Sequence, residues 1–175
     1  MHISRSSERK RVEIDFITLE EMKQHLRVQH NEDDAIIFSQ IYAATENAEK
    51  FLRMHIIKKE IEVTILGDIE REIPIDIYPI NNIHSFKYYH NSVEFKIKEK
   101  EDFEFDDTTA KIFVKKIYIS DVAKILLEVG FGDQVASSIK QGIMKHVEKI
   151  YNNRPLEEVF KEVVPFYQTH RRYGL

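Results

Sequence analysis

The spacing of apolar residues changes twice along the chain, and this double change constrains the fold more than any other feature. Over residues 18–57 apolar residues recur every three or four positions, as in a helix with one buried face. Over residues 61–132 they alternate with polar residues, as in strands, and over residues 137–164 the helical spacing returns. The sequence therefore predicts an α+β fold: two N-terminal helices, an antiparallel β-insert of short strands, and two C-terminal helices packed with the first pair.

The first helix pair begins at a capping box. The hydroxyl of Thr18 is placed to accept a hydrogen bond from the amide of Glu21, whose carboxylate reaches back to the amide of Thr18. After a short helix and an acidic turn, a second helix is predicted from Asp33 to Ile57, with Asn31 or Asp33 as its N-cap. At about 1.5 Å per residue this helix would be roughly 37 Å long. Its predicted apolar stripe consists of Ile37, Ile41, Ala44, Ala48, Phe51 and His55, broadened by Ile36 and Leu52.

The β-insert is predicted to hold five to seven short strands. Pro74 has no amide to donate, so the strand around it is expected at a sheet edge or at a strand start. One hairpin is expected to turn at residues 90–92, and a second to join residues 103–105 to residues 112–114. Residues 125–129 are predicted to form the last strand.

The C-terminal part is predicted to hold a helix from Ser137 or Ser138 to Asn152 and another from Leu156 to Pro165, because the residue before a proline disfavours helical backbone. Residues 165–175 then form an aromatic and basic tail. Tyr, Phe and Arg are residue types that anchor interfaces, so the tail is a candidate docking element. The alternative is that this segment folds back on its own core.

Composition bounds the kind of protein. The 175 residues are enough for one domain with a substantial core, and we treat residues 1–175 as a single domain whose residues 1–13 form a flexible basic arm. The net charge of −4 argues against general nucleic-acid affinity. There is no cysteine, no apolar run of membrane-spanning length, and no signal-peptide pattern at the N-terminus. We therefore expect a protein of the cytoplasm where it is made, with no membrane partner.

The residue types of catalysis and metal binding are present without the spacings that such chemistry needs. Eight histidines occur, but no Glu-x-x-His and no His-Glu-x-x-His. The five glycines form neither a phosphate-binding loop nor a dinucleotide fingerprint, and no nucleophile elbow is present. Asp106 and Asp107 are interpreted as turn residues of a hairpin. We therefore predict no catalytic, cofactor-binding or metal-ligating residue, no cofactor, and no enzyme.

The order of features resembles the head–tail connector proteins of long-tailed phages and gene transfer agents. The helix pair carries the first part of the resemblance, and four later segments follow in the family's order. These are Thr18-Leu19-Glu20-Glu21-x-Lys23-x-x-Leu26-Arg27-Val28 with Asp33-Asp34, Pro79-Ile80-x-x-Ile83-x-Ser85-Phe86-x-Tyr88, Asp102-Phe103-x-Phe105-Asp106, Val129-Gly130-Phe131-Gly132, and Ile139 through Tyr151-Asn152-Asn153-Arg154. The resemblance covers about residues 17–173. Two features depart from the family: no proline precedes the third helix, and Asn152 stands where the family usually has glutamate.

The resemblance implies a structural, non-enzymatic subunit of an oligomeric ring that joins the portal of a phage, prophage or gene-transfer-agent head to its tail. Implied partners are the portal protein, neighbouring copies, and the next connector or tail protein, with DNA passing through the lumen unbound. The implied location is the host cytoplasm during assembly and then the virion neck. The family's docking segment corresponds here to Phe166, Tyr167, His170, Arg171, Arg172 and Tyr173, and the candidate subunit contacts are Asp33, Asp34, Glu46 and Glu49.

One alternative function comes from a different class. The basic N-terminal arm and the pair Arg171-Arg172 would suit a nucleic-acid-binding module. Such a module would bind DNA or RNA with an affinity that falls steeply with salt.

Overall fold

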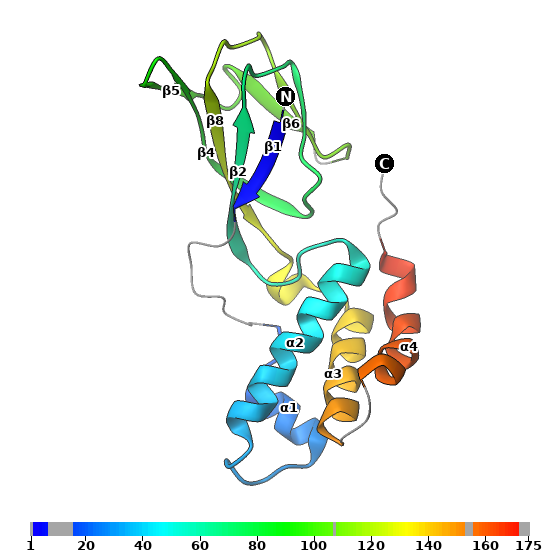
Figure 1. Ribbon diagram of the computed structural model, residues 1–175. Coiled ribbons are helices and arrows are strands. Elements are labelled where there is room, and N and C mark those ends of the chain that lie inside the picture. The colour runs from blue at the N-terminus through cyan, green and yellow to red at the C-terminus, as the bar shows by residue number, and fades with distance from the viewer. Residues whose placement is uncertain (1, 7–15, 107, 153–155, 172–175) are drawn as a thin grey trace. The chain divides into compact units, whose positions relative to one another are not determined.

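The computed structural model describes residues 2–6, 16–106, 108–152 and 156–171, with the backbone alone at residues 2–6 and 156–158. Where the sequence suggests a single domain, the chain divides into two compact units. We call residues 1–12 and 58–130 the β-unit, and residues 13–57 and 131–175 the helical unit (Figure 1). The β-unit thus begins and ends within three residues of the predicted β-insert, and it also includes the N-terminal segment.

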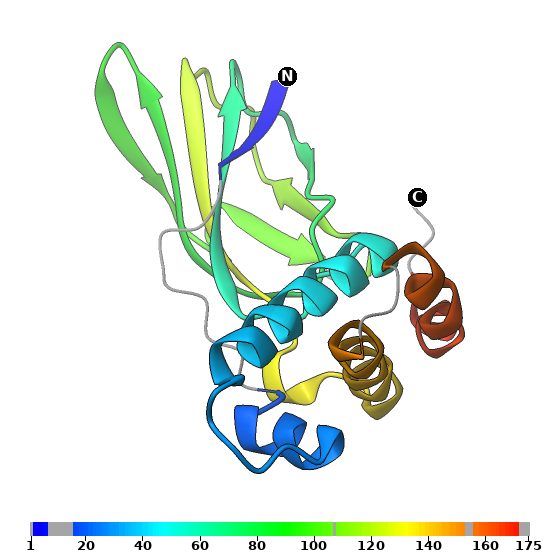
Figure 2. The ribbon, with the colours of Figure 1, turned by 60° about the horizontal axis from the view of Figure 1, so that its bottom comes forward.

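The helical unit contains the four predicted helices. They are α1 (Leu19–Leu26), α2 (Asp34–Leu52), α3 (Ser137–Tyr151) and α4 (Leu156–Tyr167), with the 3₁₀ turns η1 (Gly132–Gln134) and η2 (Gln168–His170). The amide of Glu21 donates to the Thr18 hydroxyl at 3.1 Å, which confirms the predicted cap of α1. Helix α3 packs against both α2 and α4, and α1 packs against α2 and α3 (Figure 2).

Helix α2 is shorter than its sequence pattern predicts. It ends at Leu52, because Arg53 adopts a left-handed conformation with φ of 57°. The carboxylate of Glu49 turns back over the helix end and accepts from the amides of Ile56 and Ile57 at 2.6 and 3.0 Å. These 19 residues are about 28 Å long rather than roughly 37 Å. The predicted continuation to Ile57 is therefore wrong, because a side chain binds the amides that would have continued the helix.

Helix α4 is longer than predicted, because it continues through Pro165 to Tyr167. The sequence placed the helix end at this proline, and that prediction is wrong. Val159, Val163 and Tyr167 follow one another at intervals of four, and each is 0% exposed. Their shared burial favours two further helical residues over the loss of one backbone hydrogen bond at the proline.

The β-unit is built from two antiparallel sheets. One has the order β1-β2-β8-β4-β5, and the other has the order β3-β7-β6. The seven strands β2 to β8 confirm the predicted insert, and Pro74 lies on β3 at the edge of the smaller sheet, as expected. The strands are β1 (His2–Ser6), β2 (Lys59–Leu66), β3 (Glu72–Pro74), β4 (Ile80–His90), β5 (Val93–Ile97), β6 (Phe103–Asp106), β7 (Lys111–Val114) and β8 (Val122–Val129).

The apolar residues of alternate strand positions fill the core of the β-unit. Ile125 of β8, at the centre of the larger sheet, is fully buried, as are Ile73 and Ile112 of the smaller sheet. The β4–β5 hairpin turns at Asn91 and Ser92, which both have positive φ, within the predicted residues 90–92. Near this turn the core is incomplete: Phe95 lies on the same side of β5 as the buried Ile97, but it is 41% exposed.

The N-terminal arm differs from its prediction. Residues His2–Ser6 form β1 and pair antiparallel with β2 at one edge of the larger sheet, so the expectation of a flexible arm is wrong for these five residues. Their backbone amides and carbonyls gain partners on β2, which the polar composition of the segment does not reveal. The remainder of the arm, residues 7–13, lies outside the described residues.

Candidate functional site

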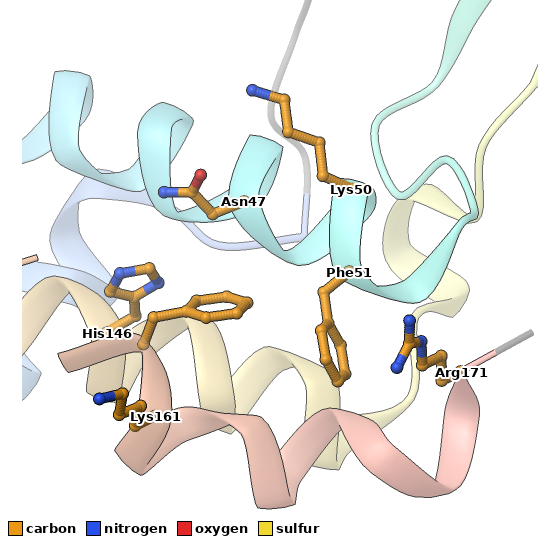
Figure 3. Close-up of a pocket in the computed structure, with 7 residues that line it drawn as sticks. Asn47, Lys50, Phe51, His146, Lys161 and Arg171 are labelled. Carbon is orange, nitrogen blue, oxygen red and sulfur yellow. The ribbon is translucent and has the colours of Figure 1, made fainter. Parts of the chain in front are cut away.

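A cavity of about 780 Å³ opens in the helical unit among α2, α3, α4 and the residue that follows η2 (Figure 3). A volume of this size admits several side chains of a partner. The lining residues are Asn47, Lys50, Phe51, His146, Phe160, Lys161 and Arg171.

The cavity forms where side chains of α2, α3 and α4 face one another. Asn47 and Phe51 stand one turn apart on α2 and therefore share a face. Helix α4 closes the opposite side because Gly142 lets it approach α3 closely: a Cβ at Gly142 would lie 2.5 Å from Cε1 of Tyr167 and 2.8 Å from Cβ of Phe166. A glycine in the middle of a helix is unfavourable by itself, so its value here is this close approach.

Aromatic rings form the apolar wall of the cavity. Phe51 meets Phe160 edge to face, with ring centroids 5.6 Å apart, and Tyr167 lies 6.2 Å from Phe51. The guanidinium of Arg171 lies over the ring of Phe51 at 4.7 Å, the geometry of a cation–π contact. Figure 3 shows the Phe51 ring pointing from α2 toward α4, with Arg171 beside it. The wall thus combines an apolar surface with a fixed positive charge.

His146 contributes the most unusual polar group of the cavity. The residue is 0% exposed, and within the described residues neither ring nitrogen has a hydrogen-bond partner. Burial lowers the pKa of His146 below its ordinary value, so the ring is neutral at pH 7, with one nitrogen able to donate and the other able to accept. The ring lies 6.0 Å from that of Phe160. Two unsatisfied nitrogens at a cavity wall favour a bound group that supplies their partners.

The charged lining residues are all basic. Lys50, Lys161 and Arg171 line the cavity, and no Asp or Glu whose side chain the structure describes does. Within the described parts of the chain, neither Lys50 nor Lys161 is within ion-pair distance of a carboxylate. In Figure 3 the ammonium group of Lys50 points away from the rings, while Lys161 and Arg171 lie on opposite sides of Phe51. This cavity is therefore positive in a chain whose net charge is −4.

The predicted docking residues lie in α4, in η2 and just beyond. Tyr167 is 0% exposed, with its hydroxyl buried and without a partner among the described residues, whereas Phe166 is half-buried. His170 Nε2 and Ser138 Oγ lie 2.8 Å apart, and Arg171 lines the cavity. Arg172 and Tyr173 fall outside the described residues. Residues 166–171 thus fold back on the helical unit, which is the alternative that the sequence left open.

Three of the four candidate subunit-contact acids make bonds within their own unit. Asp33 accepts from the Tyr151 hydroxyl at 2.5 Å instead of capping α2 through its side chain. Asp34 pairs with Lys23 at 2.7 Å. Glu49 binds the amides that follow α2, as described above. Glu46 is half-buried on α2. The acids are therefore spread along α2 and do not form one acidic patch.

Several apolar side chains that the sequence pattern does not single out are exposed in the structure. On α2, Ile36 is 53% exposed, although the helical stripe places it in the core, and Phe38 is 50% exposed. On the β-unit, Val93 and Phe95 of β5 and Ile117 and Ile119 between β7 and β8 are exposed. The available signal was that α2 carries apolar residues around nearly its whole circumference, which is typical of a helix covered on more than one side.

The comparisons with known proteins agree with one another. The sequence profile of the phage gp6-like head-tail connector protein family matches residues 16–153. The fold is similar to a chain in the neck of an empty gene transfer agent (GTA) particle computed with C6 symmetry, with TM-score 0.72 and 14% identity. It is also similar to chains in the virion of the native GTA particle (TM-score 0.77, 15% identity) and in the neck of the native particle computed with C12 symmetry (0.66, 13%). Each similarity covers 100% of this chain and 97% of the other.

No curated protein matches the chain significantly. Within the described residues, no three His, Asp or Glu side chains gather closely enough to hold a metal ion. In the same parts of the chain, no helix has both the length and the apolarity that crossing a bilayer requires.

Proposed function

The chain belongs to the phage gp6-like head-tail connector family, and we propose that it is one subunit of an oligomeric ring that joins the portal of a phage, prophage or gene-transfer-agent head to the tail. The single observation that carries this proposal is the family match, because it spans 16–153 and so includes segments of both units. A structural role in virion assembly follows from the family. The ring, its partners and its contacts are the parts that we propose.

A ring closes when each subunit presents two different surfaces that fit each other. Exposed apolar side chains supply such surfaces: Ile36 and Phe38 on α2, and Val93 and Phe95 on β5. Because these side chains are only about half exposed, burying one of them is worth roughly half of the 1.5–3 kcal/mol for a fully exposed side chain. The β5 strand also pairs only with β4 among the described strands, so its outer edge offers backbone groups to a neighbour. Glu46 remains a candidate contact, whereas Asp33, Asp34 and Glu49 have intramolecular roles.

The portal is the proposed partner of the segment that runs from the end of α4 into η2. Phe166, His170 and Arg171 are its described members, and Arg172 and Tyr173 extend the proposal beyond the described residues. A tail protein or second connector is the proposed partner on the opposite side of the ring. The acidic net charge favours a lumen through which DNA slides without binding. Such a subunit assembles in the host cytoplasm and remains in the virion neck.

The experiment is light scattering of the purified protein with and without portal rings of the same particle. We expect a discrete complex with the portal and loss of higher assemblies on Phe38→Ser. Deleting residues 166–175 is a poor test, because it removes Tyr167 from the core. Two separate variants test the docking site better: one lacks residues 172–175, and the other carries Phe166→Ser. Unchanged portal binding by both variants would move the docking site elsewhere, and no portal complex under any condition would contradict the proposal.

The nucleic-acid alternative is not favoured by the family or by the similar folds. Part of the basic arm forms β1, and Arg171 lies over Phe51. Filter binding at physiological salt separates the two functions, since a nucleic-acid module requires measurable affinity with a steep salt dependence.

A further inference from the structure

We propose that the cavity among α2, α3 and α4 binds an acidic segment of a partner protein, with an Asp or Glu carboxylate beside Lys161 and an apolar side chain against Phe51. This inference deepens the proposed function, because it rests on the chain having a protein partner in the particle neck. It names the chemistry of that partner, which neither the family nor the predicted docking residues supply.

Charge complementarity indicates that the ligand of this cavity is negatively charged. Among the described side chains, three basic residues and no acidic residue line the cavity. Like charges gathered around a concavity raise the local potential and favour an anion, more strongly where the walls are apolar. A carboxylate beside Lys161 would offset part of this charge.

The aromatic wall indicates that the ligand also carries an apolar side chain. The rings of Phe51 and Phe160 at 5.6 Å present an apolar surface that a small inorganic anion would leave uncovered. A side chain such as Phe or Leu would cover it. An acidic residue adjacent to an apolar residue therefore matches both features, whereas either residue alone matches one.

His146 is an independent indication that the cavity receives a ligand. A buried imidazole without partners on either nitrogen is unfavourable, because both nitrogens have lost water. A carboxylate oxygen of a ligand can accept from the donor nitrogen once the side chains that cover the ring move aside.

A nucleic-acid strand is the competing occupant, since phosphates are also anions. The cavity is lined by helices from one compact unit and carries three basic residues, whereas a strand binder follows successive phosphates along a basic groove. The acidic net charge of the chain opposes such a groove. A peptide is therefore the favoured ligand, and nucleic acid becomes an outcome of the test.

The test is fluorescence anisotropy of the full-length protein with four labelled probes. They are a hexapeptide of alternating Glu and Phe, its Gln–Phe analogue, its Glu–Ser analogue, and a single-stranded DNA hexamer. We expect the Glu–Phe peptide to bind about tenfold more tightly than either analogue. Lys161→Gln should weaken its binding about fivefold, and Arg53→Gln, which removes an equal charge outside the lining, should change it less than twofold.

A second measurement reports on the cavity itself. In two-bond proton–nitrogen NMR spectra, the ring nitrogens of His146 should shift as the Glu–Phe peptide is added, and His146→Gln assigns the signals among the eight histidines. Absence of binding, binding that Lys161→Gln does not affect, an unmoved His146, or stronger binding of the DNA hexamer would each overturn the inference. No portal or ring is present in this assay. A negative result here would therefore contradict the cavity proposal and leave the ring proposal unaffected. Failure to bind the portal, with normal peptide binding, would contradict the ring proposal alone.

Discussion

Gly142→Ala tests whether the C-terminal segment is part of the folded core or a free docking tail. In an exposed helix, replacing glycine by alanine stabilises by about 1 kcal/mol. Here the new methyl group would lie 2.5 Å from Cε1 of Tyr167 and 2.8 Å from Cβ of Phe166. Because Cβ of Phe166 cannot rotate away, α4 must move by about 1 Å to restore ordinary contact distances of about 3.5–4.0 Å. Two opposing effects thus decide the sign of the change.

The steric effect should dominate. Inserting a methylene into a packed core costs about 1–3 kcal/mol, which exceeds the gain in helix propensity. We therefore expect a net loss of about 1–2 kcal/mol in the free energy of unfolding. Urea unfolding followed by circular dichroism at 222 nm measures it, because this signal reports on the helices. Gln141→Ala is the matched control: the residue is exposed on the same helix, and its effect should stay within about 0.5 kcal/mol.

A double-mutant cycle with Tyr167→Leu identifies the contact. Leucine is shorter than tyrosine, so in this background Gly142→Ala should cost less than in the native chain. If Gly142→Ala instead stabilises the native chain by about 1 kcal/mol, α4 does not pack on α3 as described. Residues 166–171 would then be free to act as the docking tail that the sequence first suggested.

Three further predictions follow from the helical unit. Glu49→Gln should lower the free energy of unfolding by about 1–3 kcal/mol in urea titrations, because a neutral amide is a weaker acceptor for the amides of residues 56–57. Because burial lowers the pKa of His146 below about 6.5, the unfolded chain binds more protons at acid pH. Stability should therefore fall as the pH decreases below 6.5, and less steeply in His146→Gln. Ile36→Ser with Phe38→Ser should abolish self-association in light scattering while leaving the unfolding midpoint of the monomer nearly unchanged, because both side chains are exposed.

The element order could be predicted from the sequence, because burial on one face imposes its period on the residues. Ile37 and Ile41 on α2 and Ile61 to Ile65 on β2 follow that rule, and the Thr18 cap is a local motif. Helix ends were predicted less well. Arg53 ends α2 because Glu49 binds amides seven and eight residues away, and Pro165 does not end α4 because Tyr167 remains buried. Both outcomes depend on contacts that no local pattern encodes.

The candidate site could be predicted only in part. Arg171 was singled out for its residue type, and the structure places it at the cavity. His146, Phe160 and Lys161 were not, because each fits an ordinary amphipathic helix and only the packing of three helices brings them together. Tyr167 had the right type for an interface, but it is buried. Residue type therefore predicts what a side chain can bind, and packing decides whether it is accessible.

The most direct test of the central claim is electron microscopy of particles made by a producer strain deleted for this chain, with and without added purified protein. A connector subunit predicts DNA-filled heads without tails in the deletion strain, and tailed particles with neck density beneath the portal after addition. Normal tailed particles from the deletion strain would contradict the account.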